Sequence, residues 1–83
     1  MVTKLDVFLV IGLNSKINIK DIQTKLSISN YQSIHNLIKQ LIKEDLVYVE
    51  NKLYFLNYNN NKSKELFSLV YFCFKNNLDY NFI

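Results

Sequence analysis

The segment spanning residues 19–46 constrains the fold most, because it predicts two short amphipathic helices separated by a tight break. Asn18 and Ser29 are each followed three residues later by an acid or an amide. At this spacing a capping side chain and its partner satisfy the free N–H groups at the start of a helix. The pattern therefore predicts a helix-turn-helix over residues 18–43.

The second predicted helix has an apolar arc and a polar arc when its residues are placed at about 100° intervals. The apolar arc contains Tyr31, Ile34, Leu37, Ile38, Leu41 and Ile42. The polar arc contains Gln32, Asn36, Lys39 and Lys43, flanked by Ser33, His35 and Gln40. No acidic residue occurs between Asp21 and Glu44, so the polar arc offers only neutral hydrogen-bonding groups and positive charge. Such a surface suits the phosphates and base edges of nucleic acid.

Positive charge is concentrated in the same region. The whole chain has a formal net charge of +3. Residues 16–43 hold five lysines and one acid, a balance of +4, whereas residues 44–57 hold one lysine and three acids, a balance of −2. This asymmetry favours a nucleic-acid partner, with a solvated lysine-rich face as the alternative.

The spacing of the apolar residues in the helix-turn-helix region is the feature that can be compared with known families. These residues lie in IKDIQTKLSIS over residues 19–29, in SIHNLI over residues 33–38, and at Leu41, Leu46 and Val47. This order resembles the helix-turn-helix core of winged-helix regulators of the MarR and ArsR type, over roughly residues 17–56. The resemblance implies a recognition helix followed by a β-hairpin wing. Asp45 stands where glycine is usual, and aspartate tolerates the left-handed conformation that such a turn requires.

The N-terminal region predicts a helix over residues 4–13. Thr3 and Asp6 have the spacing of a capping box, and the apolar run VFLVIGL follows. The β-branched residues of this run support a strand as the alternative, but the cap and the resemblance both favour a helix. Its apolar side chains point in nearly all directions, which a surface helix of a monomer does not allow. We therefore expect part of this helix to contact a second copy of the chain.

A hairpin is predicted over residues 46–56, where two β-branched and aromatic runs flank a short polar turn. Ile17 is expected to form a brief strand that pairs with it, and Tyr48 and Tyr54 are expected to be packing residues. Lys52 is the only cation of the hairpin. The hairpin either reaches DNA through Lys52 or merely completes the core.

A last helix is predicted over residues 63–77, after an asparagine-rich connector whose composition we attribute to coding bias. Apolar side chains cover most of its circumference, more than one small domain buries. A homodimer built on the first and last helices covers both surfaces. The expected interface residues are Val7, Val10, Ile11, Phe67, Val70, Tyr71 and Phe74. Two-fold symmetry then places the recognition helices about 34 Å apart and predicts a pseudo-palindromic DNA site.

The composition argues against catalysis. One histidine and one cysteine, Cys73, provide neither a four-ligand zinc site nor a nucleophile with its base and helper. The single glycine, Gly12, lies inside an apolar helix, so a glycine-rich phosphate loop is absent from the sequence. We therefore expect no enzymatic activity, no cofactor and no metal.

The sequence also predicts a cytoplasmic protein without a membrane partner. No apolar run approaches the ~18 residues needed to span a bilayer. A single cysteine forbids an internal disulfide, and a secretory signal is not recognisable. All ten basic residues are lysine, and asparagine is abundant, which hints at AT-rich coding in a microbe, plasmid or virus. For a virus the expected location is the host cytoplasm.

Together these features predict one α+β, mainly helical winged-helix domain over residues 1–83, which binds double-stranded DNA as a homodimer and regulates transcription. The alternative is a winged-helix adaptor that binds protein and not DNA. The candidate DNA-binding residues are Lys20, Lys25, Asn30, Gln32, Ser33, His35, Asn36, Lys39, Lys43 and Lys52. Gln32 has a competing interpretation, because a capping role would hold its amide against the backbone of Ser29.

Overall fold

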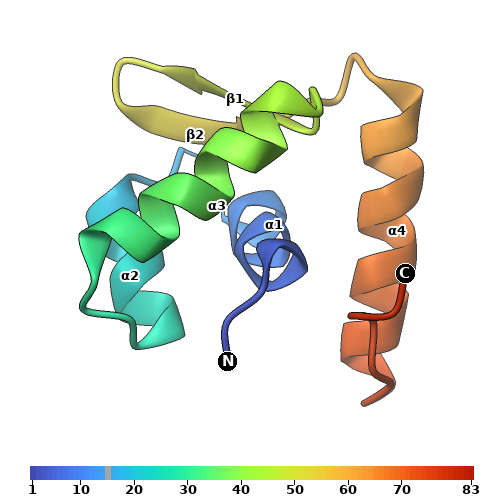
Figure 1. The fold of residues 1–83 in the computed structure, drawn as a ribbon. Helices are drawn as coiled ribbons and strands as arrows, with labels where there is room; N and C mark the ends of the chain where they lie inside the picture. Colours follow the sequence, from blue (N-terminus) through green and yellow to red (C-terminus); the bar gives the residue numbers. More distant parts are fainter. Residues whose placement is uncertain (15) are drawn as a thin grey trace.

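The computed structural model describes residues 1–14 and 16–83. These residues form a mainly helical α+β arrangement with one antiparallel hairpin (Figure 1). The elements are α1 (Lys4–Leu13), α2 (Ile19–Leu26), α3 (Tyr31–Lys43), β1 (Val47–Glu50), β2 (Leu53–Leu56) and α4 (Asn61–Lys75). No helix in the described part of the chain has the length and apolar character needed to cross a membrane.

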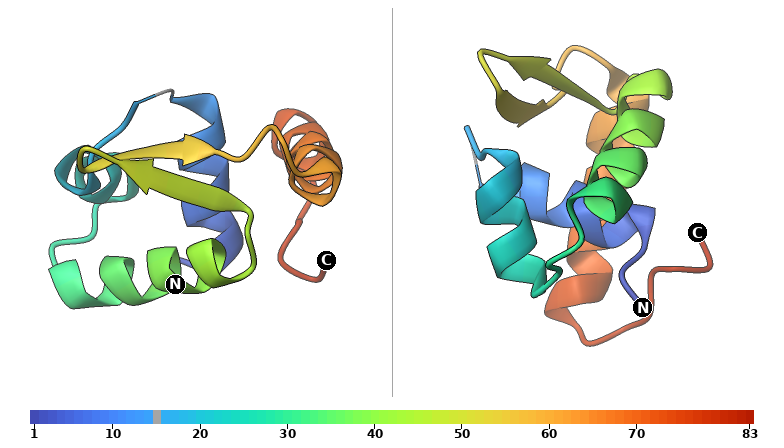
Figure 2. Two further views of the ribbon diagram at one scale, coloured as in Figure 1. Left: turned by 90° about the horizontal axis from the view of Figure 1, so that it is seen from above. Right: turned by 60° about the vertical axis from the view of Figure 1, so that its left-hand side comes forward.

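Helix α1 lies at the centre and contacts α2, α3, α4 and β2 (Figure 2). Thr3 and Asp6 form the capping box, in which the Asp6 N–H donates to Thr3 Oγ1 and the Thr3 N–H donates to Asp6 Oδ2. The predicted helix over residues 4–13 is therefore confirmed, and the strand alternative is wrong. Its apolar residues point in several directions because other elements of the same chain cover it on several sides.

This central position corrects the expected dimer interface. Val7 and Val70 are 0% exposed and Ile11 is 1% exposed within the single chain, so these three residues are unavailable to a second copy. Val10, Phe67 and Tyr71 are half-buried and pack against the core, and only Phe74 among the expected interface residues is exposed. The error came from treating α1 as a surface helix, whereas the chain surrounds it.

Gly12 allows α4 to approach α1 closely. A Cβ atom at Gly12 would lie 2.1 Å from an atom of the Phe67 ring, well inside van der Waals contact. The Phe67 ring meets the Phe8 ring edge-on, with centroids 6.0 Å apart, and lies parallel to the Tyr71 ring with centroids 5.9 Å apart. The only glycine of the chain thus provides the space that seats Phe67.

The hairpin has the register expected for a two-residue turn, with Glu50 opposite Leu53. Asn51 and Lys52 at its turn have φ values of 52° and 64°, which is the left-handed pattern of a type I′ turn. The Tyr54 N–H donates to the Ile17 carbonyl over 2.8 Å, which confirms the brief strand expected at Ile17. Tyr54 is half-buried and packs against the core, and Tyr48 stacks on Phe55 although it is 40% exposed, so both tyrosines are packing residues as expected.

The asparagine-rich connector has structural roles that the sequence interpretation missed. Asp45 has a φ of 62°, and its backbone carbonyl accepts from the side-chain amides of Asn57 and Asn60. Asn60 also caps α4 by accepting from the Lys62 N–H. Because of this cap, α4 begins at Asn61 and ends at Lys75, two residues earlier at each end than predicted.

Replacing Asp45 with alanine tests this junction. The variant loses the carboxylate that accepts from both asparagine side chains and places a less tolerant residue in a left-handed conformation. We expect the free energy of unfolding, measured by urea titration, to fall by about 1–3 kcal/mol. Asp45→Asn, which keeps both an acceptor oxygen and left-handed tolerance, should lose less. An alanine variant that unfolds at the wild-type urea concentration would contradict this role.

The segment after α4 returns to the start of α1 (Figure 2). The Tyr80 hydroxyl donates to Asp6 Oδ1, and Thr3 Oγ1 donates to Asn81 Oδ1 over 2.5 Å. Burial, followed by the hydrogen bond to Asp6 and the charge of that carboxylate, raises the pKa of Tyr80 above its ordinary value. The capping box of α1 is therefore also the attachment point of residues 80 and 81.

Candidate nucleic-acid interface

The N-cap of helix α3 lies one residue later than predicted. Asn30, not Ser29, is the N-cap, and its Oδ1 accepts from the Ser33 N–H over 3.2 Å. The break is longer because Ser27 adopts a left-handed conformation with a φ of 55°, while the Gln23 amide donates to the carbonyls of Ile28 and Ser29. The start of α3 is thus fixed by side chains from both sides of the break.

The inner side of α3 packs on the core through Ile34, Ile38 and Leu41, which are at most 1% exposed. This packing turns the opposite side of the helix to solvent. Exposed side chains at i, i+4, i+7 and i+11 run along it, and we call them the α3 stripe: Gln32, Asn36, Lys39 and Lys43. The predicted polar arc is therefore confirmed in one respect: these four side chains are exposed to solvent.

Gln32 and Asn36 form a pair within the stripe. Gln32 Nε2 donates to Asn36 Oδ1 over 2.8 Å, and the capping role expected for Gln32 at Ser29 is wrong because the N-cap is Asn30. The pair uses one Oδ1 lone pair of Asn36, and within the described residues the Asn36 amide donors are left available for another partner. A side-chain donor and acceptor on one asparagine match the N7 acceptor and N6 donor that adenine presents in the major groove.

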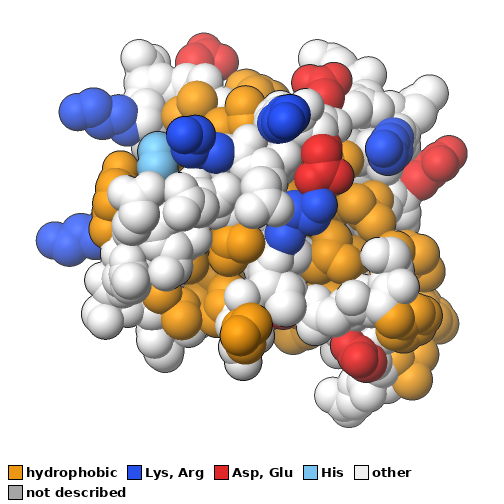
Figure 3. All heavy atoms as spheres, viewed as in Figure 1, with side chains coloured by type: hydrophobic (Ala, Val, Ile, Leu, Met, Phe, Trp, Pro, Cys, Tyr) orange, Lys and Arg blue, Asp and Glu red, His pale blue; other side chains and the backbone are white. Residues whose placement is uncertain are grey.

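The lysines of the stripe have no carboxylate partner among the residues that the structure describes. The single ion pair found there joins Lys4 Nζ to Glu44 Oε2 over 2.5 Å, outside the stripe. Lys39 and Lys43 are exposed, as are Lys20 and Lys25 on α2. Blue side chains are spread over the upper part of the face that carries α3 and the hairpin (Figure 3). These cations are available to neutralise phosphates.

His35 does not belong to the stripe, which corrects its predicted exposed position. Its ring is half-buried and stacks on Tyr31 with centroids 5.4 Å apart and an interplanar angle of 13°. Its Nδ1 is buried without a hydrogen-bond partner. The exposed member of this pair is Tyr31, at 51%, although its place in the apolar arc predicted burial. Ile42, 38% exposed on the same edge of the arc, departs from that prediction in the same way.

Tyr31 is therefore a surface aromatic beside the stripe that the sequence interpretation missed. Burial, and then the proximity of Tyr31, raises the pKa of the Tyr54 hydroxyl. The exposure of Tyr31 could have been predicted from the sequence, because this residue lies at the edge of the apolar arc and directly after the cap residue. A tyrosine at that edge has a polar tip that favours contact with water.

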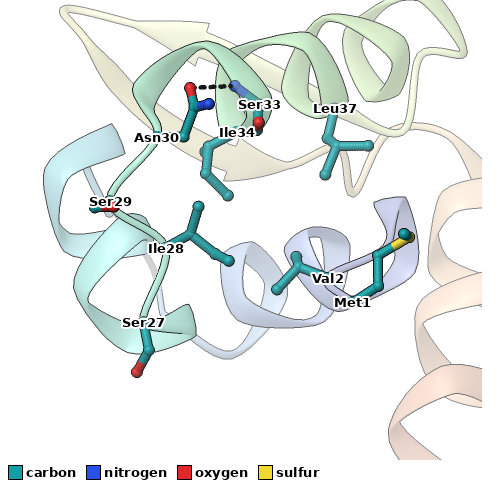
Figure 4. A pocket seen from close by; sticks show the side chains of 9 residues that line it. All are labelled: Met1, Val2, Ser27, Ile28, Ser29, Asn30, Ser33, Ile34 and Leu37. Atoms are coloured by element: carbon teal, nitrogen blue, oxygen red, sulfur yellow. Dashed lines mark hydrogen bonds between the residues drawn. The ribbon is translucent and has the colours of Figure 1, made fainter.

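Ser33 and Asn30 lie on the other flank, where they line a hollow of about 740 Å³ (Figure 4). The hollow lies between the N-terminal residues, the α2–α3 break and α3. Its apolar wall is formed by Met1, Val2, Ile28, Ile34 and Leu37. Asn30 has a structural role as the cap, so these two predicted contact residues are separated from the stripe.

Lys52 lies at the turn of the hairpin and is exposed. The turn, α2 and the N-terminal end of α3 lie on the same side of the molecule (Figures 1 and 2).

Comparisons of the chain with protein-family models, with curated proteins and with solved structures give no match.

Proposed function

We propose that the chain is a winged helix-turn-helix protein that binds double-stranded DNA as a homodimer and regulates transcription. The observation that carries the proposal is the α3 stripe, an exposed helical surface with amides at one end, lysines at the other and no acid between Asp21 and Glu44. An α-helix with its side chains is about 10–12 Å across, which matches the ~12 Å width of the major groove.

The proposed roles follow from the chemistry of each side chain. Asn36 reads a base, preferentially adenine, and Gln32 holds it in place through the 2.8 Å hydrogen bond between their amides. Lys39 and Lys43 bind phosphates along the groove, and Lys20 and Lys25 bind phosphates from α2. The combination of α2, α3 and the following hairpin supports the resemblance to MarR- and ArsR-type regulators on which the regulatory role rests.

A gel-shift titration tests the proposal. The chain should retard a random duplex at low salt and release it steeply as salt rises, because each phosphate contact contributes about −0.9 to the slope of log K against log salt. Four lysine contacts predict a contribution of about −3.6 to this slope from each bound chain of the homodimer. Absence of any shift at low salt would contradict DNA binding.

The second candidate is an adaptor that binds protein without DNA. The observation that favours it is the largely apolar hollow beside the α2–α3 break, which the stripe does not use. A chain with this function should ignore the duplex at every salt concentration.

The hairpin turn provides a separate prediction. Lys52→Glu should weaken duplex binding about tenfold and lower the salt slope by about one, because it removes a cation at the turn and adds an anion. Lys62→Glu on α4 is the matched control, since it makes the same charge change at an exposed site away from the hairpin. Equal affinities of the two variants, measured by gel shift, would exclude a DNA contact at the turn.

A further inference from the structure

The outer side of α4 carries apolar side chains that the chain itself does not cover. Leu69 and Phe72 are 47% and 57% exposed, whereas Val70 and Cys73 are buried. Orange side chains gather at the lower right of Figure 3, where the lower part of α4 and the C-terminal segment lie. An exposed phenylalanine and leucine on one helix, beside polar neighbours, are typical of a protein contact.

A second feature of this side is a hollow of about 420 Å³ beside Ser68. It is lined by Ser68, Tyr71, Phe72, Lys75 and Asn76, and we call it the Ser68 hollow. Lys75 Nζ lies 5.5 Å from the centroid of the Tyr71 ring, a cation–π distance that holds the lysine at the wall.

The sequence spacing connects these features. Exposed residues at i, i+3, i+7 and i+10 define what we call the α4 seam: Glu65, Ser68, Phe72 and Lys75. At about 100° per residue they fall within an arc of about 80°, the spacing of alternating a and d positions in a coiled coil. The seam therefore has the periodicity of a helix-pairing surface.

The seam is complementary to itself when two copies run antiparallel. Pairing about the level of Val70 sets Phe72 of each copy opposite Ser68 of the other. The same register sets Glu65 of each copy opposite Lys75 of the other, so both charges are neutralised. A single register thus places each Phe72 ring against the partner's hollow and each charge opposite its counter-charge. Both copies use the same residues, as in an isologous two-fold contact.

We propose that α4 pairs antiparallel with α4 of a second copy, with the phenyl ring of each Phe72 in the Ser68 hollow of the other. This inference rests on the homodimer of the proposed function and replaces the contact expected from α1. A helix of 15 residues is about 22 Å long, so the interface is small and its dissociation constant is expected in the micromolar range.

Sedimentation equilibrium without DNA tests the pairing. The wild-type chain should form a dimer at micromolar concentration, and Phe72→Ser should weaken it by at least about thirtyfold, as loss of a central aromatic does at other interfaces. Phe74→Ser is the matched control, because Phe74 is similarly exposed, at 50%, but lies off the seam. A wild-type monomer at tens of micromolar, or equal effects of the two serine variants, would overturn the proposal.

Charge reversal tests the register. Glu65→Lys and Lys75→Glu should each weaken self-association about tenfold, because each turns two attractive contacts into repulsive ones. An equimolar mixture of the two variants should restore the dimer as a heterodimer in which both contacts are again attractive. Single variants that dimerise like the wild type would overturn the antiparallel register.

The outcome is separable from DNA binding. If the chain dimerises but fails to shift a duplex, the α4 pairing stands and the proposed function falls. If the chain shifts a duplex at low salt but sediments as a monomer without DNA, the α4 pairing and the homodimer fall and DNA binding stands.

Discussion

Replacing Phe67 with aspartate should strongly destabilise the folded chain rather than split a dimer. The Phe67 ring packs against Phe8, against Tyr71 and into the space over Gly12, so a carboxylate there faces apolar groups without a partner. We expect a loss of about 4 kcal/mol, compared with a total stability of about 4–12 kcal/mol for a domain of 83 residues. Circular dichroism during urea titration measures it.

Phe72→Asp is the matched control for this prediction. It places the same charge on the same helix, five residues further along the chain, but on the exposed side. The variant should remain folded with nearly wild-type stability as a monomer. If Phe67→Asp is as stable as Phe72→Asp, the seat of Phe67 over Gly12 does not stabilise the fold.

Gly12→Ala tests the same contact by adding a methyl group beneath the Phe67 ring. Alanine gains about 1 kcal/mol of helix propensity over glycine, yet its Cβ requires the Phe67 ring to leave its position. Overpacking of this kind costs about 1–3 kcal/mol, so Gly12→Ala should be neutral to destabilising. In a Phe67→Ala background the same substitution should become stabilising. Urea titration of the four variants should therefore show that the change in the free energy of unfolding caused by Gly12→Ala reverses its sign.

The second large effect is expected at Asn36, where alanine should relax base discrimination about tenfold to a hundredfold if the proposed function holds. Lys39→Ala should instead weaken binding about equally on all sequences and lower the salt slope by about one. Competition of a selected site against random duplex measures discrimination, and the salt titration measures the slope. The two variants therefore separate base reading from phosphate binding on one helix.

Gln32→Ala adds an internal control, because Gln32 donates to Asn36 and is expected to act through it. A variant lacking both amides should discriminate no worse than Asn36→Ala alone. Gln40→Ala, exposed on the flank of α3, should leave discrimination unchanged. Retained discrimination in Asn36→Ala would contradict the assignment of this residue to base reading.

Local signals in the sequence were sufficient for several elements. The capping box at Thr3 and the polar arc of α3 predicted α1 and the stripe, because both depend on residues within one or two helical turns. The α3 cap was misplaced by one residue because Ser29 and Asn30 are both good caps. The choice depends on Gln23, which holds the Ser29 carbonyl from the preceding helix.

Other features depended on packing that periodicity does not encode. An apolar helix surrounded by its own chain and one that contacts a second copy have the same pattern, so Val7 and Ile11 were assigned to the wrong partner. The opposite error occurred at Tyr31, where membership of the apolar arc predicted burial but its edge position leaves it exposed. The seating of Phe67 over Gly12 involves residues 55 positions apart and left no local signal.

The attachment of Tyr80 to Asp6 has a kinetic consequence. A mainly helical chain is expected to fold quickly, because most contacts within helices are local. Here the first turn of α1 is joined to residues 40 positions away through Lys4 and Glu44, and 74 positions away through Asp6 and Tyr80. The entropy of closing such loops must be lost before these contacts form. These contacts at the first turn of α1 are therefore expected to form late in folding. The first turn is also expected to exchange amide hydrogens sooner than the centre of the helix.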